Sequence, residues 1–280
     1  MTWPLSWAHY PQGSKGTPMT HPYLTGTTAP RVLAHRGLVT PRDEALGIAE
    51  NSRASVTAAV LAGSEYVESD CHLTSDGVAV LFHDSDLRRV TGDPRAVAAV
   101  SYAELAELMA ERGGLLTLRE ALEEFTDTRF NIDVKAAAVA ELAGTIIWEH
   151  CGRVLLTSFS DEYRARALAA ARRAAGGLAG ADRPATSPGR GALIRLLLAV
   201  HFGSESARAR AFKGLDALQI PERQGPVRVL SPRLIEAAHH AGVEVHVWTV
   251  NDPARMKELV ALGVDGIITD RADLALEALR

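Results

Sequence analysis

RVLAHRGLVTPRDEALGIAENSRASVTAAVLAGSEYVESD, residues 31–70, predicts one strand–helix–strand unit. The short runs Arg31–Ala34 and Tyr66–Asp70 have the length and the β-branched or aromatic content of strands. The alanine-rich run Ser52–Ala62 between them is typical of a helix. Because two parallel strands need a crossover of this kind, the stretch indicates an α/β fold with a parallel sheet.

The same alternation continues along the chain of 280 residues. Further strands are expected at Phe130–Val134, Arg153–Thr157, Asp216–Ile220, Glu244–Val250 and Gly266–Thr269, with a weak one near Arg183–Thr186. Helical patterns fill most gaps: Tyr102–Glu111, Leu118–Phe125, Ala137–His150, Asp161–Ala174, Leu193–Phe202, Ser231–His240 and Pro253–Leu262. About eight such units favour a (β/α)8 TIM barrel. A doubly wound open sheet is the alternative, although the turn after the first strand lacks its Gly-x-Gly-x-x-Gly pattern.

One segment breaks the alternation. Tyr66–Leu73 leads through Thr74-Ser-Asp-Gly77 into Val78–His83, with no room for a helix between the two runs. Asp-Gly between alternating apolar residues predicts a β-hairpin. We therefore expect a hairpin extension after the second strand, which would place His83 opposite or beside Glu68.

The N-terminal stretch, residues 1–30, is rich in Pro, Gly, Thr and Tyr and is expected to be a flexible segment, with residues 31–280 forming a single domain. No run approaches the roughly 20 apolar residues that span a bilayer, so no stable membrane insertion is expected. Two distant cysteines and no signal-peptide pattern indicate a cytoplasmic protein. The most apolar helical run, Leu193–Phe202, is either an outer helix packed on the barrel or a lip that contacts lipid.

The net charge of −4 argues against a general nucleic-acid partner, which would carry a basic stripe to neutralise phosphates. It does not exclude a small anionic substrate, because a metal ion and a few cations can reverse the potential inside one cleft.

Three carboxylates follow predicted strands at their carboxyl ends, which form the active-site face of a barrel. Glu68 and Asp70 lie two residues apart on one strand, so their side chains point the same way, and Asp133 ends the next strand. Like charges so close oppose folding unless they are compensated. A hard divalent cation, Mg²⁺ or Ca²⁺, would compensate them. The alternative is salt bridges with Arg36 and Lys135.

Two histidines, His35 and His83, sit at separate strand ends and can titrate near neutral pH. Around a metal-bound phosphate such a pair can act as general base and general acid. Arg36 and Lys135 suit the phosphate itself, arginine through its planar fork and lysine as a point charge. For a single histidine, a structural hydrogen bond is the competing interpretation.

These residues form an ordered set of motifs from residue 31 to residue 270. The set comprises His35-Arg36-Gly37, Glu50-Asn51-Ser52, Glu68-Ser-Asp70, His83-Asp84, Asn131-Ile-Asp-Val-Lys135, Ser158-Phe159, Trp248-Thr-Val-Asn251 and Asp265–Asp270. It resembles the glycerophosphodiester phosphodiesterase family, whose barrel is related to that of phosphatidylinositol-specific phospholipases. The resemblance implies a catalytic barrel domain that hydrolyses glycerophosphodiesters, as small-molecule substrates, to sn-glycerol 3-phosphate and an alcohol.

The resemblance also implies roles for single residues. His35 and His83 match the catalytic acid–base pair, and Glu68, Asp70 and Asp133 match the ligands of a required Mg²⁺ or Ca²⁺. The residues that match substrate-binding positions are Arg36, Glu50, Lys135 and Trp248.

Three features depart from the family pattern. Asp133 stands where glutamate is usual, Ala49 replaces a proline, and the loop between His35 and Glu50 is longer than in compact members. That loop either sets the preference for the alcohol moiety or is a neutral insertion. Two other functions are kept open: a lysophospholipase D-like or other barrel phosphodiesterase acting on a lipid or polymer, and a catalytically idle protein that binds glycerophosphodiesters.

Overall fold

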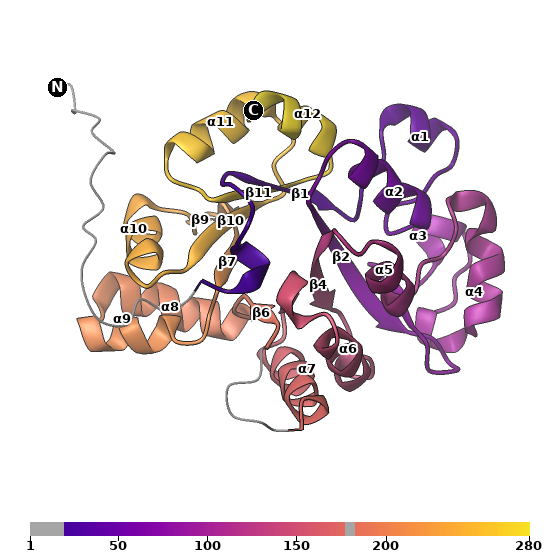
Figure 1. The fold of residues 1–280 in the computed structure, drawn as a ribbon, viewed down its shortest axis with the longest axis horizontal. Helices are drawn as coiled ribbons and strands as arrows, with labels where there is room; N and C mark the ends of the chain where they lie inside the picture. Colours follow the sequence, from indigo (N-terminus) through magenta and orange to yellow (C-terminus); the bar gives the residue numbers. More distant parts are fainter. Residues whose placement is uncertain (1–19, 177–182) are drawn as a thin grey trace.

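Eight parallel strands form a nearly closed barrel with helices around it, which confirms the predicted TIM barrel (Figure 1). The computed structural model describes residues 20–176 and 183–280. In spatial order the strands are β6 (Ala185–Thr186), β5 (Val154–Thr157), β4 (Arg129–Val134), β2 (Tyr66–Leu73), β1 (Arg31–His35), β11 (Gly266–Thr269), β10 (Glu244–Trp248) and β7 (Ala217–Pro221). β1 and β11, the first and the last of these strands along the chain, pair with each other, as expected of a barrel that closes in chain order.

The seam of the barrel lies between β6 and β7, where β6 is only two residues long. Asp216 bridges this seam with two hydrogen bonds to Thr186. The backbone N–H of Asp216 donates to Thr186 O (3.0 Å), and its side chain accepts from Thr186 N (2.8 Å). A further bond runs from Gln219 N to the hydroxyl of Ser187. A few bonds of this kind replace a full strand ladder, so the weak signal of the eighth strand has a structural cause.

Helices lie around the barrel, although α1 and α3 bury none of their residues. They are α1 (Pro41–Ala45), α2 (Arg53–Leu61), α3 (Arg88–Thr91), α4 (Tyr102–Met109), α5 (Leu118–Glu124), α6 (Ala140–Trp148), α7 (Asp161–Ala174), α8 (Arg190–Phe202), α9 (Glu205–Phe212), α10 (Pro232–His240), α11 (Pro253–Ala261) and α12 (Ala272–Ala278). Capping boxes begin α2 at Ser52 and α4 at Ser101, each satisfying free N–H groups of the first turn. The helices that the sequence did not predict, α1, α3, α9 and α12, have at most eight residues each.

Helix α8 packs on the barrel through Leu196 and Val200, which are buried, as expected of an outer helix. Its opposite side exposes Ile194, Leu198 and Phe202, each at least 50% accessible. Within the described ranges, no helix has both the length and the apolarity needed to span a membrane.

Strand β3 (Ala79–Leu81) runs antiparallel to the second half of β2, with Cys71 opposite Leu81. The hydrogen bonding to β2 continues one residue beyond β3, because Phe82 N donates to Asp70 O at 2.9 Å. His83 follows directly, so the antiparallel pairing carries it back along β2, from the carboxyl end at Leu73 to the level of Asp70.

Buried residues also occur before Arg31. Residues 1–19 lie outside the described residues, but Tyr23 and Leu24 in a short 3₁₀ turn are buried. The Tyr23 ring packs edge-on against Tyr66 at 5.2 Å between centroids. Arg31 ties the turn to the barrel by donating to Leu24 O at 2.8 Å. Two apolar residues within a Pro-, Gly- and Thr-rich stretch gave too weak a pattern to predict this contact.

Replacing Tyr23 should therefore destabilise the whole barrel. Tyr23→Ala removes a fully buried ring, and we expect it to lower the free energy of unfolding by about 3 kcal/mol or more in urea titrations. Tyr23→Phe is the matched control: the Tyr23 hydroxyl has no hydrogen-bond partner among the described residues, so its loss should leave stability unchanged or raise it. A loss below about 1 kcal/mol for Tyr23→Ala would mean that the turn is not part of the core.

Candidate active site

Parallel register brings the predicted site residues of three neighbouring strands to one end of the barrel. His35 at the end of β1 is level with Glu68 on β2, and Asp70 on β2 is level with Asp133 on β4. Lys135 directly follows β4. The structure thus gathers the predicted histidine, carboxylates and lysine at the carboxyl ends of adjacent strands, as the barrel topology requires.

The three carboxylates are almost fully buried, and their pKa values diverge. Burial, together with the negative charge of Asp70, raises the pKa of Glu68 to about 8. Burial also raises the pKa of Asp133 and outweighs the attraction of Lys135. For Asp70 the cations prevail over burial: Lys135 and Arg36 hold its pKa below the usual range. The neighbouring cations therefore outweigh burial at Asp70, but they do not outweigh it at Glu68 or Asp133.

Lys135 and Arg36 supply that compensation. Lys135 Nζ lies 2.9 Å from Asp70 Oδ1 and 2.6 Å from Asp133 Oδ2. Arg36 Nε lies 3.2 Å from Asp70 Oδ2, while its Nη1 donates to Glu50 Oε1 at 2.8 Å. Salt bridges, the alternative to a cation in the sequence analysis, thus exist at Asp70 and Asp133.

The turn that presents Arg36 depends on two residues with positive φ. Arg36 itself has φ 58°, an uncommon conformation for a side-chain-bearing residue, and its backbone N–H is fixed by Glu68 O at 2.7 Å. Gly37 follows with φ 86°, and a Cβ atom there would lie 2.6 Å from the backbone of Ser55. Only glycine fits, which gives the His-Arg-Gly motif a structural reason.

Whether a cation fits depends on the carboxylate oxygens that remain unpaired. Glu68 Oε2 and Asp133 Oδ1 are buried and have no hydrogen-bond partner within the part of the chain that the structure describes. Unpaired buried oxygens of ionisable groups are rare and indicate an absent partner. In those same ranges, no three His, Cys, Asp or Glu side chains stand in an arrangement that could hold a metal ion as they lie. The donor chemistry fits a hard divalent cation, while binding would require these side chains to rearrange.

His35 is anchored by Asp270, which belongs to a recognised motif but was not selected as a site residue. Its Nδ1 lies 2.6 Å from Asp270 Oδ1, and its Nε2 lies 3.7 Å from Glu68 Oε2. Burial alone would lower the pKa of His35, but the charges and hydrogen bond of Glu68 and Asp270 raise it overall. Asn251 in turn donates to Asp270 Oδ2 at 2.7 Å. Two signals could have indicated this role: Asp270 ends the recognised motif Asp265–Asp270, and it directly follows the last strand β11.

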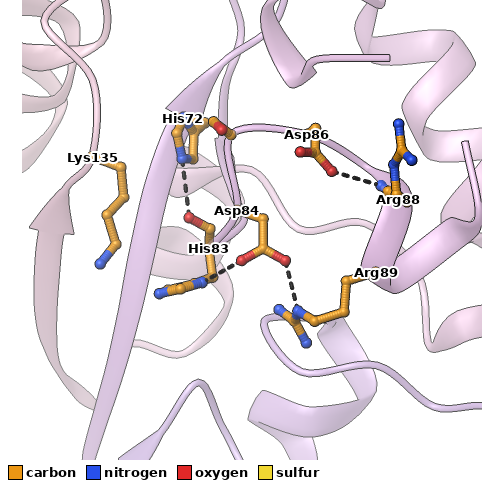
Figure 2. Close-up of a pocket in the computed structure, with 8 residues that line it drawn as sticks. His72, His83, Asp84, Asp86, Arg88, Arg89 and Lys135 are labelled. Atoms are coloured by element: carbon orange, nitrogen blue, oxygen red, sulfur yellow. Dashed lines mark hydrogen bonds and ion pairs between the residues drawn. The ribbon is translucent and has the colours of Figure 1, made fainter. Parts of the chain in front are cut away.

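His83 has the same kind of partner in its neighbour. Its Nδ1 lies 2.6 Å from Asp84 Oδ1 (Figure 2). A positive charge on His83 would lower the pKa values of Asp70 and Asp133, so the ring is within electrostatic reach of the acidic cluster. The ring opens on a cavity of about 570 Å³, whose lining residues are His72, His83, Asp84, Ser85, Asp86, Arg88, Arg89 and Lys135.

One aromatic side chain lies near Lys135, and a second packs against that ring. Trp248, at the end of β10, packs edge-on against Phe159 at 5.8 Å between ring centroids. Lys135 Nζ lies 5.3 Å from the centroid of the Phe159 ring, which is 59% exposed. Phe159 belongs to a recognised motif but was not selected as a site residue. An exposed ring beside Lys135, which is predicted to bind phosphate, suits contact with the apolar atoms of a substrate.

The raised pKa of Glu68 makes the stability of the metal-free protein pH-dependent. Between its unfolded value of 4.5 and about 8, folded Glu68 keeps a proton that the unfolded chain has lost. Raising the pH through this window therefore favours unfolding. In EDTA, Glu68→Gln should exceed the wild type in unfolding free energy at pH 8 by on the order of 1 kcal/mol or more, with a smaller gap at pH 5. Urea titrations at both pH values measure this.

The exposed Glu65, at the other end of the same strand region, provides the control variant Glu65→Gln, which should leave the pH dependence of stability as in the wild type. If the unfolding free energies of the wild type and Glu68→Gln changed in parallel with pH, Glu68 would not be the group responsible for the pH dependence.

Known proteins resemble this chain in sequence and in fold. Residues 35–274 match the glycerophosphoryl diester phosphodiesterase family. The "Probable glycerophosphodiester phosphodiesterase 2" of Mycobacterium tuberculosis is 37% identical over 251 residues, 88% of this chain and 89% of that protein. The crystal structure of a glycerophosphodiester phosphodiesterase from Thermotoga maritima has a TM-score of 0.64 at 25% identity, covering 89% of this chain and 97% of its own.

A phosphodiesterase from Oleispira antarctica, solved in complex with the product sn-glycerol-3-phosphate, shares the fold with a TM-score of 0.66 at 22% identity, covering 90% and 97% of the two chains. The family match spans most of the chain, and the Mycobacterium relative covers nearly all of it at more than 30% identity. This chain therefore belongs to the glycerophosphoryl diester phosphodiesterase family of enzymes.

Proposed function

We propose that this enzyme hydrolyses glycerophosphodiesters to sn-glycerol 3-phosphate and an alcohol, using His35 and His83 as an acid–base pair. The observation that carries the proposal is that each imidazole is anchored at Nδ1 by a carboxylate, His35 by Asp270 and His83 by Asp84, both at 2.6 Å. A carboxylate at one ring nitrogen fixes the tautomer and leaves the other nitrogen free to exchange protons with a substrate.

Diester hydrolysis requires two proton transfers. One imidazole takes the proton of the attacking oxygen, which belongs either to water or to the 2-hydroxyl of the substrate. The other gives a proton to the departing alkoxide, a poor leaving group at neutral pH without protonation. A protein that only binds glycerophosphodiesters would need neither histidine, so the two anchored imidazoles favour an enzyme over an idle binder.

Charge on the phosphoryl group is balanced by Arg36 and Lys135, whose side chains already lie against the buried carboxylates. Glu50 orients Arg36 through the 2.8 Å hydrogen bond. Trp248, packed on Phe159, offers an apolar surface to the glycerol or alcohol moiety. These contacts support substrate-binding roles for all four predicted residues.

The family generally uses a divalent metal, and Glu68, Asp70 and Asp133 are the residues that would hold it here. When bound, such an ion would act as a Lewis acid on a phosphoryl oxygen. Oxygen-only donors favour Mg²⁺ or Ca²⁺ over zinc. Asp133 supports this assignment despite its shorter side chain, because its Oδ1 is buried and unpaired among the described residues.

Removal of either imidazole should abolish most turnover. We expect His83→Ala and His35→Ala each to lower kcat on glycerophosphoglycerol by at least ~10²-fold, the usual scale of general acid–base catalysis. Release of sn-glycerol 3-phosphate measures the rate. His201→Ala serves as the control, because His201 is an exposed residue of α8 outside the site.

Near-normal activity of His83→Ala would contradict the acid–base assignment. Assaying a lysophospholipid beside the soluble diester also separates the two substrate classes: turnover of the lipid alone would favour the lysophospholipase D-like alternative.

A further inference from the structure

Arg89, which lines the cavity beside His83, contacts two carboxylates from different parts of the chain. Its Nε donates to Asp84 Oδ2 at 2.6 Å (Figure 2), and its Nη2 donates to Glu50 Oε1 at 2.5 Å. Glu50 belongs to the loop between β1 and α2, whereas Asp84 follows β3. One guanidinium group thus joins two loops that border the site.

Both carboxylates also contact residues of the proposed catalytic machinery. Asp84 accepts from Arg89 through Oδ2 and lies 2.6 Å from His83 Nδ1 through Oδ1. Glu50 Oε1 accepts from Arg89 and from Arg36 Nη1. A continuous series of ion pairs and hydrogen bonds therefore runs from His83 through Arg89 to Arg36, which itself contacts the buried Asp70.

The backbone that carries Arg89 is held firmly although its side chain is half exposed. Leu87, two residues earlier, is fully buried in a small cluster with Val80 and Phe82 of the segment leading to His83. The Thr91 hydroxyl closes the short helix α3 by donating to Leu87 O at 3.0 Å. Asp86 accepts from the N–H of Arg88 and begins the same turn. The backbone at Arg89 is consequently held in place by these contacts.

We propose that Arg89 is a positioning residue: through Asp84 it fixes the orientation of the His83 imidazole, and through Glu50 it ties that orientation to Arg36. The planar fork of arginine suits this task because it can hold two carboxylates in one fixed geometry. Lysine would provide the charge without the fork. Since the Arg89 side chain is 51% exposed, its ion pairs contribute little to overall stability, and its effect is expected in the geometry of the site.

The proposal rests on the proposed function, because Arg89 can only affect turnover through His83 if His83 takes part in it. The experiment compares Arg89→Gln, Arg89→Lys, Asp84→Asn, the double variant Arg89→Gln/Asp84→Asn and His83→Ala in kcat, KM and Tm. Arg95→Gln is the matched control: Arg95 lies in the same excursion between β3 and α4 and also pairs with two carboxylates, Asp93 and Glu104.

We expect Arg89→Gln to lower kcat by about tenfold to 10²-fold, the scale of misplacing a reacting group, with a smaller change in KM and an unchanged Tm. Arg89→Lys should recover only part of the loss. The double variant should lose much less than the product of the two single losses, because both substitutions disturb one unit. Arg95→Gln should match the wild type.

Normal kcat in Arg89→Gln, together with an inactive His83→Ala, would overturn the positioning role and leave the proposed function intact. An active His83→Ala would instead overturn the proposed function. If Arg89→Gln lowered Tm and its losses multiplied with those of Asp84→Asn, Arg89 would be a structural residue acting independently of Asp84, and the proposal would also be wrong.

Discussion

The burial of three neighbouring carboxylates is the constraint on which the site depends. Glu68, Asp70 and Asp133 are at most 7% exposed, and Lys135 and Arg36 satisfy chiefly Asp70. Burial, together with the charge of Asp70, raises the pKa of Glu68 to about 8. Burying such charge opposes folding, so a cluster of this kind is typical of a site kept for function rather than for stability.

The barrel creates this constraint through its register. Parallel pairing sets Asp70 level with Asp133 and His35 level with Glu68, and the pleat makes Glu68 and Asp70 face the same way. The histidines then differ in how they are held. His35 is anchored from the last strand by Asp270, whereas His83 is anchored by its neighbour Asp84 and, behind it, Arg89.

The features that could be predicted from the sequence are those that depend on the alternation of strands and helices and on the positions of the strand ends. The barrel and the convergence of Glu68, Asp70 and Asp133 follow from alternation and from the two-residue spacing on one strand. Asp270 and Arg89 were missed because their partners are distant in sequence or lie in a loop whose path no periodicity defines. Tyr23 was missed for a related reason: a two-residue apolar contact in a Pro- and Gly-rich stretch has no periodic pattern to detect.

The most direct test of the central claim is a titration of EDTA-dialysed enzyme with Mg²⁺ and, separately, Ca²⁺, following Tm and the release of sn-glycerol 3-phosphate together. If a divalent cation balances the carboxylates, turnover should be absent in EDTA and return saturably with one of the ions. Tm should rise over the same concentrations, as expected of a ligand that binds only the folded state. Asp133→Asn should weaken both responses. Full turnover in EDTA, or a Tm that no cation changes, would contradict the account.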